Sequence, residues 1–482
     1  MTKIGVISLG CSKNRVNTEQ MMYLLKEAGY SVSGDINGAN VVLLNTCGFI
    51  ESAKTEAVET ILELVAAKED GRIGKLVVAG CLPQRHKENI LEELPEIDAV
   101  IGTGSFDDVV DVVDGLVKAN KGTVPLFDLF QTEEPSPCLP CLFGDINAPV
   151  SETPRIISTS PIWAYLKIAE GCDNRCAYCC IPDIRGKFRS RPLENIVKEA
   201  KKLVDKGIRE LILIAQDLTR YGVDLYGKRC LYDLLVELDK IEELKWIRLH
   251  YLYPDEFDDE LIDFIGKSGK ILKYLDIPIQ HINDKVLKKM NRRGTSNDIR
   301  GLFKRLRERI PGVVLRTSLI TGLPGEGEKE FEELCEFIRE TKIERVGVFA
   351  YSPEEGTPAS KMGRPSKKVA ERRAERLLDI QSEIMQKWNE SRIGTVITVL
   401  VEDLEIQDDP EALRARSFAE SPDVDGYIII KSNHKKSGAN EPSPCPKNQT
   451  EEPSPRLGLS PCFLDIKING IKDGKLVGTQ EI

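Results

Sequence analysis

The chain of 482 residues lacks an apolar run of the roughly 18–20 residues that a membrane-spanning helix requires. Its first residues, MTKIGVISLGCSKN, also lack the basic start and the long apolar core of a signal peptide, and their short apolar run indicates a first strand instead. We therefore expect a cytoplasmic protein with no membrane partner.

Histidine is scarce, and positive charges are fewer than negative charges. The chain holds 67 Lys and Arg against 77 Asp and Glu, a net charge of -10. Broad electrostatic binding of nucleic acid needs clustered Lys and Arg, so this balance disfavours it and suits a basic partner better. No pair among the four histidines has the spacing of zinc ligands.

Cysteine, by contrast, occurs 13 times, which in a cytosolic protein favours metal or redox chemistry because disulfides do not persist there. Cys172, Cys176 and Cys179 form a C-x3-C-x2-C pattern within GCDNRCAYCCIP. Three such thiolates can bind three irons of a 4Fe–4S cluster, which normally takes four cysteines, and this leaves one iron open for a substrate or cofactor. A structural zinc site or a group of core cysteines is the alternative, but no second C-x2-C pair lies nearby.

The first 130 residues alternate short apolar runs with helical patterns, which predicts βαβ units around a parallel sheet. Three of the runs lead into a cysteine: 4–9 into Cys11, 41–44 into Cys47 and 76–79 into Cys81. Ligands bind beyond the carboxyl ends of parallel strands, so we expect these three thiols to converge on a second metal site. The alternative is three buried core cysteines, because free cysteine is often buried.

Residues 158–391 contain six strand-like runs separated by helical patterns, which predicts a partial (βα)6 barrel. The loop of Cys172 follows the first of these runs, at the strand end where barrel chemistry is built. Residues 392–482 contain short strands without helices between them, which predicts a small antiparallel β-barrel. The predicted fold class is therefore α/β, with an N-terminal parallel α/β domain, a partial barrel and a C-terminal β-barrel.

Two segments are rich in Pro and Ser. We treat residues 131–157 as an insert and linker, and residues 435–461 as an insert in the C-terminal domain; TEEPSP occurs in both. Such stretches are usually flexible loops. We expect the cysteines in or beside them to be incidental thiols, although the C-x2-C spacing of the first two leaves a metal or redox role open: Cys138, Cys141, Cys445 and Cys462.

The motifs of the chain also resemble those of a known family. GCDNRCAYCCIP resembles the cluster motif of the radical S-adenosylmethionine (radical SAM) superfamily. SLGCSKN, NTCGFIESAK, AGCLPQR and IRGKFRSRP resemble the methylthiotransferases, nearest to those that modify an aspartate of small-subunit ribosomal protein twelve. The resemblance runs nearly end to end, apart from the two Pro/Ser-rich segments. It implies an N-terminal cluster domain, a radical SAM core and a C-terminal TRAM β-barrel.

The resemblance implies a role for each cysteine group. Cys172, Cys176 and Cys179 would hold a 4Fe–4S cluster that binds S-adenosylmethionine and cleaves it to a 5′-deoxyadenosyl radical. The group Cys11, Cys47 and Cys81 would hold a second 4Fe–4S cluster, where a sulfur methylated by another S-adenosylmethionine is delivered to the aspartate β-carbon. That C–H bond has no acidic proton, so a general base cannot activate it and a radical is needed. The implied partners are ribosomal protein twelve, free or on the ribosome, and an electron donor such as flavodoxin.

Further polar residues lie in the cluster loop or at barrel strand ends, where we expect contacts with S-adenosylmethionine. Packing or loop capping is the alternative for each of them: Tyr178, Gln216, Asp217, Gln280, Arg316 and Gly322. A basic run after the cluster loop is either solvated or in contact with substrate or cofactor: Arg185, Lys187, Arg189 and Arg191. Cys180 adjoins Cys179, and its side chain should point away from the cluster.

Two other functions remain open at this point. A tRNA-adenosine methylthiotransferase would share both clusters, but residues 392–482 hold 11 Lys and Arg against 15 Asp and Glu, and tRNA binding should require positive charge. An iron–sulfur electron carrier or scaffold would leave the polar residues at the six strand ends unexplained.

Overall fold

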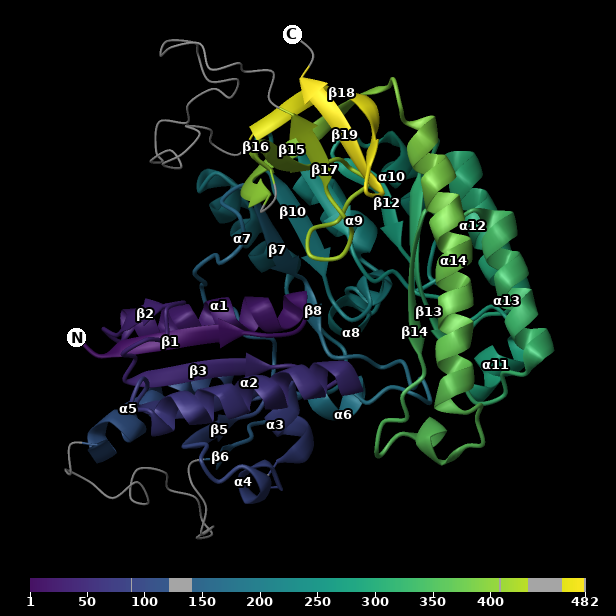
Figure 1. Cartoon of the computed structure of the whole chain (residues 1–482). Coiled ribbons are helices and arrows are strands. Elements are labelled where there is room, and N and C mark those ends of the chain that lie inside the picture. Colours follow the sequence, from purple (N-terminus) through teal and green to yellow (C-terminus); the bar gives the residue numbers. More distant parts are fainter. Residues whose placement is uncertain (88, 121–140, 407–408, 432–461, 481–482) are drawn as a thin grey trace, which may run out of the picture.

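A computed structural model of the chain describes residues 1–87, 89–120, 141–406, 409–431 and 462–480. Figure 1 shows an N-terminal α/β part (purple), a central curved sheet with outer helices (teal to green) and a small C-terminal barrel (yellow). Among the helices of these described ranges, none combines the length and the apolarity needed to cross a membrane.

The N-terminal part is a six-stranded parallel sheet in the order β2-β1-β3-β4-β5-β6. Its strands are β1 (Lys3–Ser8), β2 (Ser31–Ser33), β3 (Val41–Thr46), β4 (Lys75–Gly80), β5 (Ala99–Ile101) and β6 (Cys141–Leu142). One face packs on α1 (Ser12–Glu27) and α5 (Val109–Asn120), and the other on α2 (Glu51–Glu69), α3 (Cys81–His86) and α4 (Asn89–Glu93). The central strand β3, VVLLNT, is buried along its whole length because helices cover both faces.

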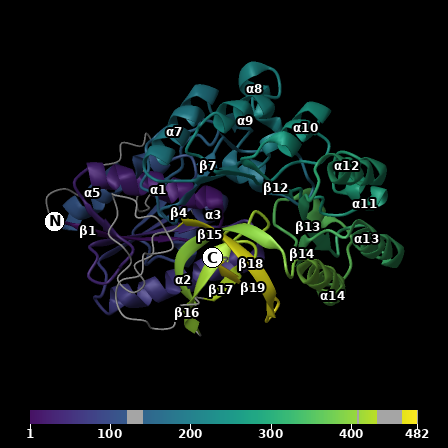
Figure 2. The same ribbon diagram turned by 90° about the horizontal axis from the view of Figure 1, so that it is seen from above.

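The central part is a six-stranded parallel sheet whose strands follow one another in chain order. They are β7 (Trp163–Lys167), β10 (Glu210–Ile214), β11 (Trp246–Leu249), β12 (Ile271–Asp276), β13 (Val314–Thr321) and β14 (Arg345–Ala350). The outer face packs on α7 (Leu193–Asp205), α9 (Leu231–Asp239), α10 (Asp259–Lys267), α12 (Ser296–Arg309), α13 (Glu328–Thr341) and α14 (Lys367–Ser391). Figure 2, seen from above, shows these helices along the outside of the curved sheet.

Short elements connect the strands and helices of the central part. They are β8 (Ala169–Glu170), which pairs with β9 (Arg189–Ser190), and the helices α6 (Ile181–Arg185), α8 (Val223–Tyr226) and α11 (Asp284–Lys289). Single 3-10 turns are η1 (Phe106–Asp108) in the N-terminal part, and η3 (Leu218–Arg220) and η4 (Pro358–Lys361) in the central part.

The C-terminal part is a closed barrel in the order β15-β16-β17-β19-β18. Its strands are β15 (Val396–Ile406), β16 (Asp409–Arg416), β17 (Ile428–Lys431), β18 (Cys462–Lys472) and β19 (Lys475–Gln480). The barrel and the segment after β16 pack on the inner face of the central sheet, where Leu400 and Ala419 join Tyr165, Ile212 and Tyr274 in one apolar cluster. The concave face of the central sheet is therefore partly filled by the C-terminal part.

The predicted α/β fold class, the partial parallel barrel and the C-terminal β-barrel are all confirmed. The C-terminal barrel departs from the prediction in one respect, since β17 and β19 run parallel. Six strands were not predicted: β2, β5, β6, β8, β9 and β16. The first five have two or three residues each, and β16, DPEALRAR, contains Pro and four charges.

The cysteines of the Pro/Ser-rich segments have separate outcomes. Cys138 and Cys445 lie outside the described residues. Cys141 belongs to β6, beside β5, and packs half-buried against the core of the N-terminal sheet, so it is not a solvated loop residue. Cys462 begins β18 and is disulfide-bonded, so the expectation of an incidental thiol is wrong for it.

Candidate functional site

The first cysteine group lies on the loop that follows β7 and β8, at the carboxyl end of the first central strand. Backbone hydrogen bonds fix this loop: Cys172 N donates to Gly186 O at 3.1 Å, and Cys179 N donates to Cys176 O at 3.1 Å. Gly171 has a φ of +79°, and a Cβ there would overlap the backbone carbonyl of Lys187. Only glycine fits at the residue before Cys172 without displacing the backbone.

Two thiols of this group, Cys172 and Cys179, are destabilised as anions by burial. Burial raises the pKa of Cys172 to about 11, and burial raises the pKa of Cys179 well above its usual range. The charge of Cys176 adds to both effects, which shows that the three thiols lie close together. A bound cation reverses this balance, because a coordinating thiol is deprotonated outright.

The second group, Cys11, Cys47 and Cys81, lies beyond the carboxyl ends of the neighbouring strands β1, β3 and β4. Burial, together with the nearby charges of Cys81 and Cys11, raises the pKa of Cys47 to about 12. The structure therefore brings together three thiols that are far apart in the sequence.

Glycines beside these cysteines permit the close approach of the three strand ends. A Cβ on Gly10 would lie 2.6 Å from Cys47 Cβ, and a Cβ on Gly48 would lie 2.8 Å from Leu82 Cα. Gly80, with a φ of +102°, directly precedes Cys81. A glycine adjoins each of the three cysteines in the sequence, as Gly10-Cys11, Cys47-Gly48 and Gly80-Cys81. The prediction of the second metal site did not use this pattern.

Neither group has the geometry of a single-ion site. Within the described ranges, no three His, Cys, Asp or Glu side chains converge as the ligands of one metal ion do. A 4Fe–4S cluster binds each thiolate at a different iron, so its ligands surround a larger object. Two sets of three neighbouring thiols fit that requirement better than they fit a zinc ion, which is typically held by four ligands.

Arg185, the last residue of α6, connects the two cysteine groups. Its Nη1 donates to Glu170 Oε1 at 2.8 Å, and its Nη2 donates to Cys81 Sγ at 3.4 Å. Glu170 lies two residues before Cys172 and also accepts hydrogen bonds from Lys167 Nζ at 3.1 Å and Gln216 Nε2 at 2.8 Å. Burial raises the pKa of Glu170, but the charges of Arg185 and Lys167 outweigh it and hold that pKa well below the usual range.

The predicted basic run is not a surface patch. Arg185 and Arg191 are buried, and Arg191 pairs with Glu152 at 2.5 Å and Glu199 at 2.7 Å. Arg189 donates to the backbone carbonyl of Lys187 at 2.6 Å, which leaves Lys187 as the exposed cation of the run. Solvation is therefore wrong as a description of the whole run, whereas contact with substrate or cofactor stays a prediction.

Tyr178 lies beside Cys176, at one side of the first group. Its hydroxyl accepts from Arg292 Nη1 at 3.2 Å, and the same nitrogen lies 3.8 Å from Cys176 Sγ as a donor. The Arg292 guanidinium also stacks over the ring of Tyr253 at 4.4 Å. Sequence reasoning missed Arg292 and Tyr253, because neither follows directly from a strand end or a motif.

Two further predicted residues also lie near the cysteine loop. Asp217 accepts from Asn174 Nδ2 at 3.0 Å and caps η3 by accepting from Thr219 N at 3.1 Å. Gln216 donates to Glu170, while its Oε1 is buried and has no hydrogen-bond partner within the described part of the chain.

The other three predicted residues make contacts with neighbouring strands and loops. Arg316 Nη1 donates to Asp276 Oδ1 at 2.7 Å. Gln280 has a φ of +68°, and its N donates to Ser318 O at 2.9 Å. Gly322 N donates to Glu326 Oε1 at 2.9 Å. The structure therefore brings Gln216 and Asp217 to the cysteine loop that contains Tyr178. The bonds of Arg316, Gln280 and Gly322 instead join neighbouring strand ends and loops.

Cys180 points toward the other cysteine group. It is buried in a small cluster with Cys81, Ile184 and Phe49. Burial raises its pKa to about 11, with a further contribution from Glu354.

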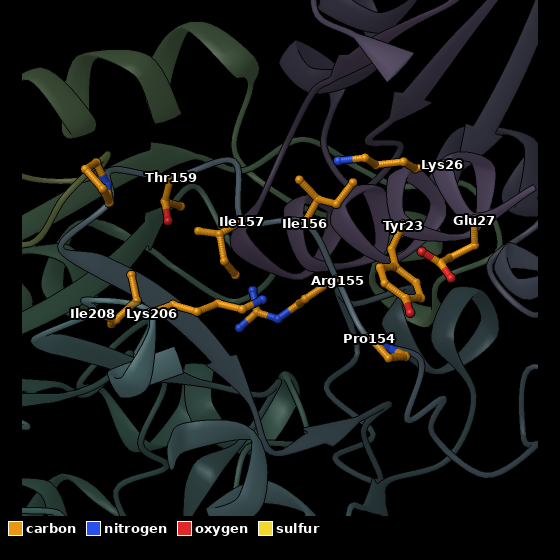
Figure 3. Close-up of a pocket in the computed structure, with 11 residues that line it drawn as sticks. Tyr23, Lys26, Glu27, Pro154, Arg155, Ile156, Ile157, Thr159, Lys206 and Ile208 are labelled. Carbon is orange, nitrogen blue, oxygen red and sulfur yellow. The ribbon is translucent and has the colours of Figure 1, made fainter. Parts of the chain in front are cut away.

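A separate cavity of about 490 Å³ lies between the C-terminal end of α1 and the central part (Figure 3). Its walls come from α1, the linker before β7 and the turn between α7 and β10, and include Tyr23, Lys26, Arg155 and Lys206. The described residues that line it include no cysteine.

Comparison with sequence families divides the chain into three matching regions. Residues 3–102 match Uncharacterized protein family UPF0004, residues 166–338 match the Radical SAM superfamily, and residues 393–480 match the TRAM domain.

Curated relatives match over most of their length. Ribosomal protein uS12 methylthiotransferase RimO of Caldanaerobacter subterraneus is 47% identical over 437 residues, which cover 90% of this chain and 95% of that protein. The protein of the same name from Lachnoclostridium phytofermentans is 42% identical over 482 residues, which cover 99% of this chain and 100% of that protein. The one from Acetivibrio thermocellus is 46% identical over 432 residues, or 89% and 92% of the two chains.

Among solved structures, the radical S-adenosylmethionine methyltransferase TsrM from Kitasatospora setae, with cobalamin and a [4Fe-4S] cluster bound, has a TM-score of 0.53. It is 13% identical and covers 74% of this chain and 77% of that chain, so the likeness concerns the fold alone.

Proposed function

The chain belongs to the family of ribosomal protein uS12 methylthiotransferases, and from this we propose that it transfers a methylthio group to the β-carbon of an aspartate in that ribosomal protein. The observation that carries the proposal is the pair of cysteine groups at the carboxyl ends of two different sheets, linked by Arg185, which donates to Cys81 of one group and to Glu170, two residues before Cys172 of the other. An electron carrier has no need of two such groups beside a set of buried polar side chains.

We assign a 4Fe–4S cluster and S-adenosylmethionine to Cys172, Cys176 and Cys179, and a second 4Fe–4S cluster to Cys11, Cys47 and Cys81. When bound, these cofactors supply a 5′-deoxyadenosyl radical at the first group and a methylated sulfur at the second. The donor set supports the assignment, because each group offers three thiols and a 4Fe–4S cluster then keeps one iron for another ligand.

The residues around the first group bind and orient S-adenosylmethionine in this proposal. Gln216 Oε1 is a buried acceptor without a partner in the described chain, so it suits a donor such as the amino group of the ligand. Tyr178 lies within the cysteine loop, where Arg292 donates to its hydroxyl, and Asp217 accepts from Asn174 of the same loop. The predicted residues at neighbouring strand ends complete the site: Gln280, Arg316 and Gly322.

The C-terminal barrel excludes water from the inner face of the central sheet. Arg416 Nη2 pairs with Glu210 Oε2 at 2.7 Å, and Arg248 Nε donates to Glu210 Oε1 at 2.8 Å, all in buried positions. Breaking such a buried pair costs about 3–5 kcal/mol, so the barrel is held firmly against the core.

The charge of the chain supports a basic protein as substrate. A net charge of -10 favours a positively charged partner and disfavours tRNA. We accordingly propose uS12, free or on the ribosome, as the substrate, a flavodoxin-like protein as the electron donor, and the cytoplasm as the place of action. We divide the chain into a cluster domain (1–130), a linker (131–157), a radical SAM core (158–391) and a TRAM-like barrel (392–482).

The test is an anaerobic reaction of the reconstituted enzyme with uS12, S-adenosylmethionine and dithionite. We expect uS12 to gain the mass of one methylthio group on one aspartate, and 5′-deoxyadenosine to form. Cys81→Ala, tested beside it, should yield no modified protein. A methylthio group found on tRNA nucleosides instead, with uS12 unchanged, would reverse the substrate assignment.

A further inference from the structure

The two terminal nitrogens of Arg185 have separate partners, and one of them donates to a cysteine. Nη1 points to Glu170, which lies two residues before Cys172, and Nη2 points to the sulfur of Cys81 and to Asn14 Oδ1. The side chain is buried, with 3% of its surface exposed. A buried guanidinium with two fixed partners has no freedom to leave the sulfur.

Asn14 and Glu170 anchor the guanidinium from both sides. Asn14 Nδ2 donates to Thr46 O at 2.7 Å and to Leu9 O at 3.3 Å, so its amide is fixed to the ends of β3 and β1. Glu170 is fixed by Lys167 and Gln216. The orientation of the Nη2 edge toward Cys81 therefore follows from contacts that do not involve the thiol.

We propose that Arg185 is a positioning residue that raises the reduction potential of the cluster on Cys11, Cys47 and Cys81 by donating a hydrogen bond to Cys81 Sγ. The inference rests on the proposed function, because it assumes that a cluster binds there. Hydrogen bonds to the sulfurs and the net charge around a cluster set its potential. A donor that also carries positive charge stabilises the more negative, reduced cluster, and low local dielectric strengthens that effect.

The test uses the full chain with Cys172, Cys176 and Cys179 replaced by Ala, so that the N-terminal cysteines hold the remaining cluster. In this background Arg185→Met removes the donor and the charge, and Glu170→Gln is added because the buried carboxylate would otherwise keep only one of its two cationic partners, Lys167. Dithionite reduces the cluster in each variant, and its midpoint potential is followed by electron paramagnetic resonance. Iron is counted in each sample.

We expect Glu170→Gln/Arg185→Met to keep about four irons per chain and to lower the ratio of reduced to oxidised cluster about tenfold at a fixed potential, which is about 59 mV for one electron. Arg185→Lys keeps the charge but loses the guanidinium fork, and should give a smaller shift in the same direction. Glu170→Gln alone removes a negative charge and should not lower the potential.

The matched control is Lys187→Met, which removes one positive charge from the same loop at an exposed position. It should leave the potential unchanged. If both Arg185 variants bind about four irons and show the same potential as their parent, the inference is overturned while the proposed function stands. If the parent binds no iron at Cys11, Cys47 and Cys81, the proposed function fails, and the inference with it.

Discussion

The two cysteine groups differ in how the chain builds them. Cys172, Cys176 and Cys179 occupy one loop, and hydrogen bonds within that loop and to Gly186 fix its shape. Cys11, Cys47 and Cys81 come from three strands, and their common level depends on strand register, which pairs Ser8 with Asn45 and Thr46 with Gly80.

The difference teaches where each group is vulnerable. A group within one loop depends on local turn chemistry, so a change in that loop disturbs it directly. A group spread over three strands exists only while the sheet is folded, so its integrity follows the stability of the N-terminal part. Arg185 then joins the local group to the distributed one, across the boundary between the two sheets.

Removing one thiol from each group provides the largest test of this comparison. Cys176→Ala and Cys81→Ala should each lower the iron content from about eight to about four per chain, because each variant loses one 4Fe–4S cluster. Cys176→Ala should abolish 5′-deoxyadenosine, whereas Cys81→Ala should still form it but produce no methylthiolated uS12. Iron analysis and chromatography of the products measure both. An unchanged iron content in Cys81→Ala would contradict the assignment of a cluster to Cys11, Cys47 and Cys81.

The same difference explains what the sequence alone could predict. The pattern of Cys172, Cys176 and Cys179 is local, so spacing was enough to identify it, and the distributed group was predicted only because each of its cysteines follows an apolar run. The partners of the thiols could not be predicted in this way. Arg292 reaches Cys176 from the segment after α11, a contact that only tertiary structure creates.

The burial and the partners of Arg185 also could not be predicted from the sequence, because tertiary structure creates them. In the sequence it lies among three other basic residues and resembles part of a charged surface. In the folded chain it is enclosed by Glu170, Asn14 and Cys81, which belong to two different sheets and their loops. Sequence patterns report the periodicity of an element but not which element packs on it.

Substituting a glycine next to a cysteine should lower the iron bound by one group and leave the other group intact. The expected effect is smaller than that of removing a thiol. Gly171→Ala places a Cβ against the Lys187 carbonyl at a positive φ, so we expect a loss of about 2–3 kcal/mol and of the iron bound by the first group. Gly48→Ala should instead lower the iron bound by the second group, because its Cβ would lie 2.8 Å from Leu82 Cα.

Gly34→Ala is the control for both substitutions, since nothing lies within 4 Å of a Cβ at that position. Its melting temperature and iron content should match those of the parent. Iron loss from the same group in both Gly171→Ala and Gly48→Ala would show that the two groups are not built independently.

The smallest expected effect comes from an ion-pair contact between the N-terminal part and the central part. Glu354, in the loop after β14, accepts from Arg85 Nη1 at 2.7 Å and from Lys54 Nζ at 3.0 Å, both in the N-terminal part. Glu354→Gln weakens these ion pairs without touching a cysteine. We expect 5′-deoxyadenosine formation to stay unchanged and methylthio transfer to fall by up to about tenfold, equivalent to about 1.4 kcal/mol.

The matched control is Glu237→Gln, which breaks a pair with Lys240 on the surface of α9, where exposed ion pairs contribute little. It should change neither product. Methylthio transfer needs both cysteine groups held at a fixed distance from each other, whereas cleavage of S-adenosylmethionine needs only Cys172, Cys176 and Cys179. Glu354→Gln should therefore lower the first rate and not the second. A parallel fall of both rates in Glu354→Gln would mean that the interface supports the local group as well, and the distinction between a local and a distributed group would then not hold at the level of function.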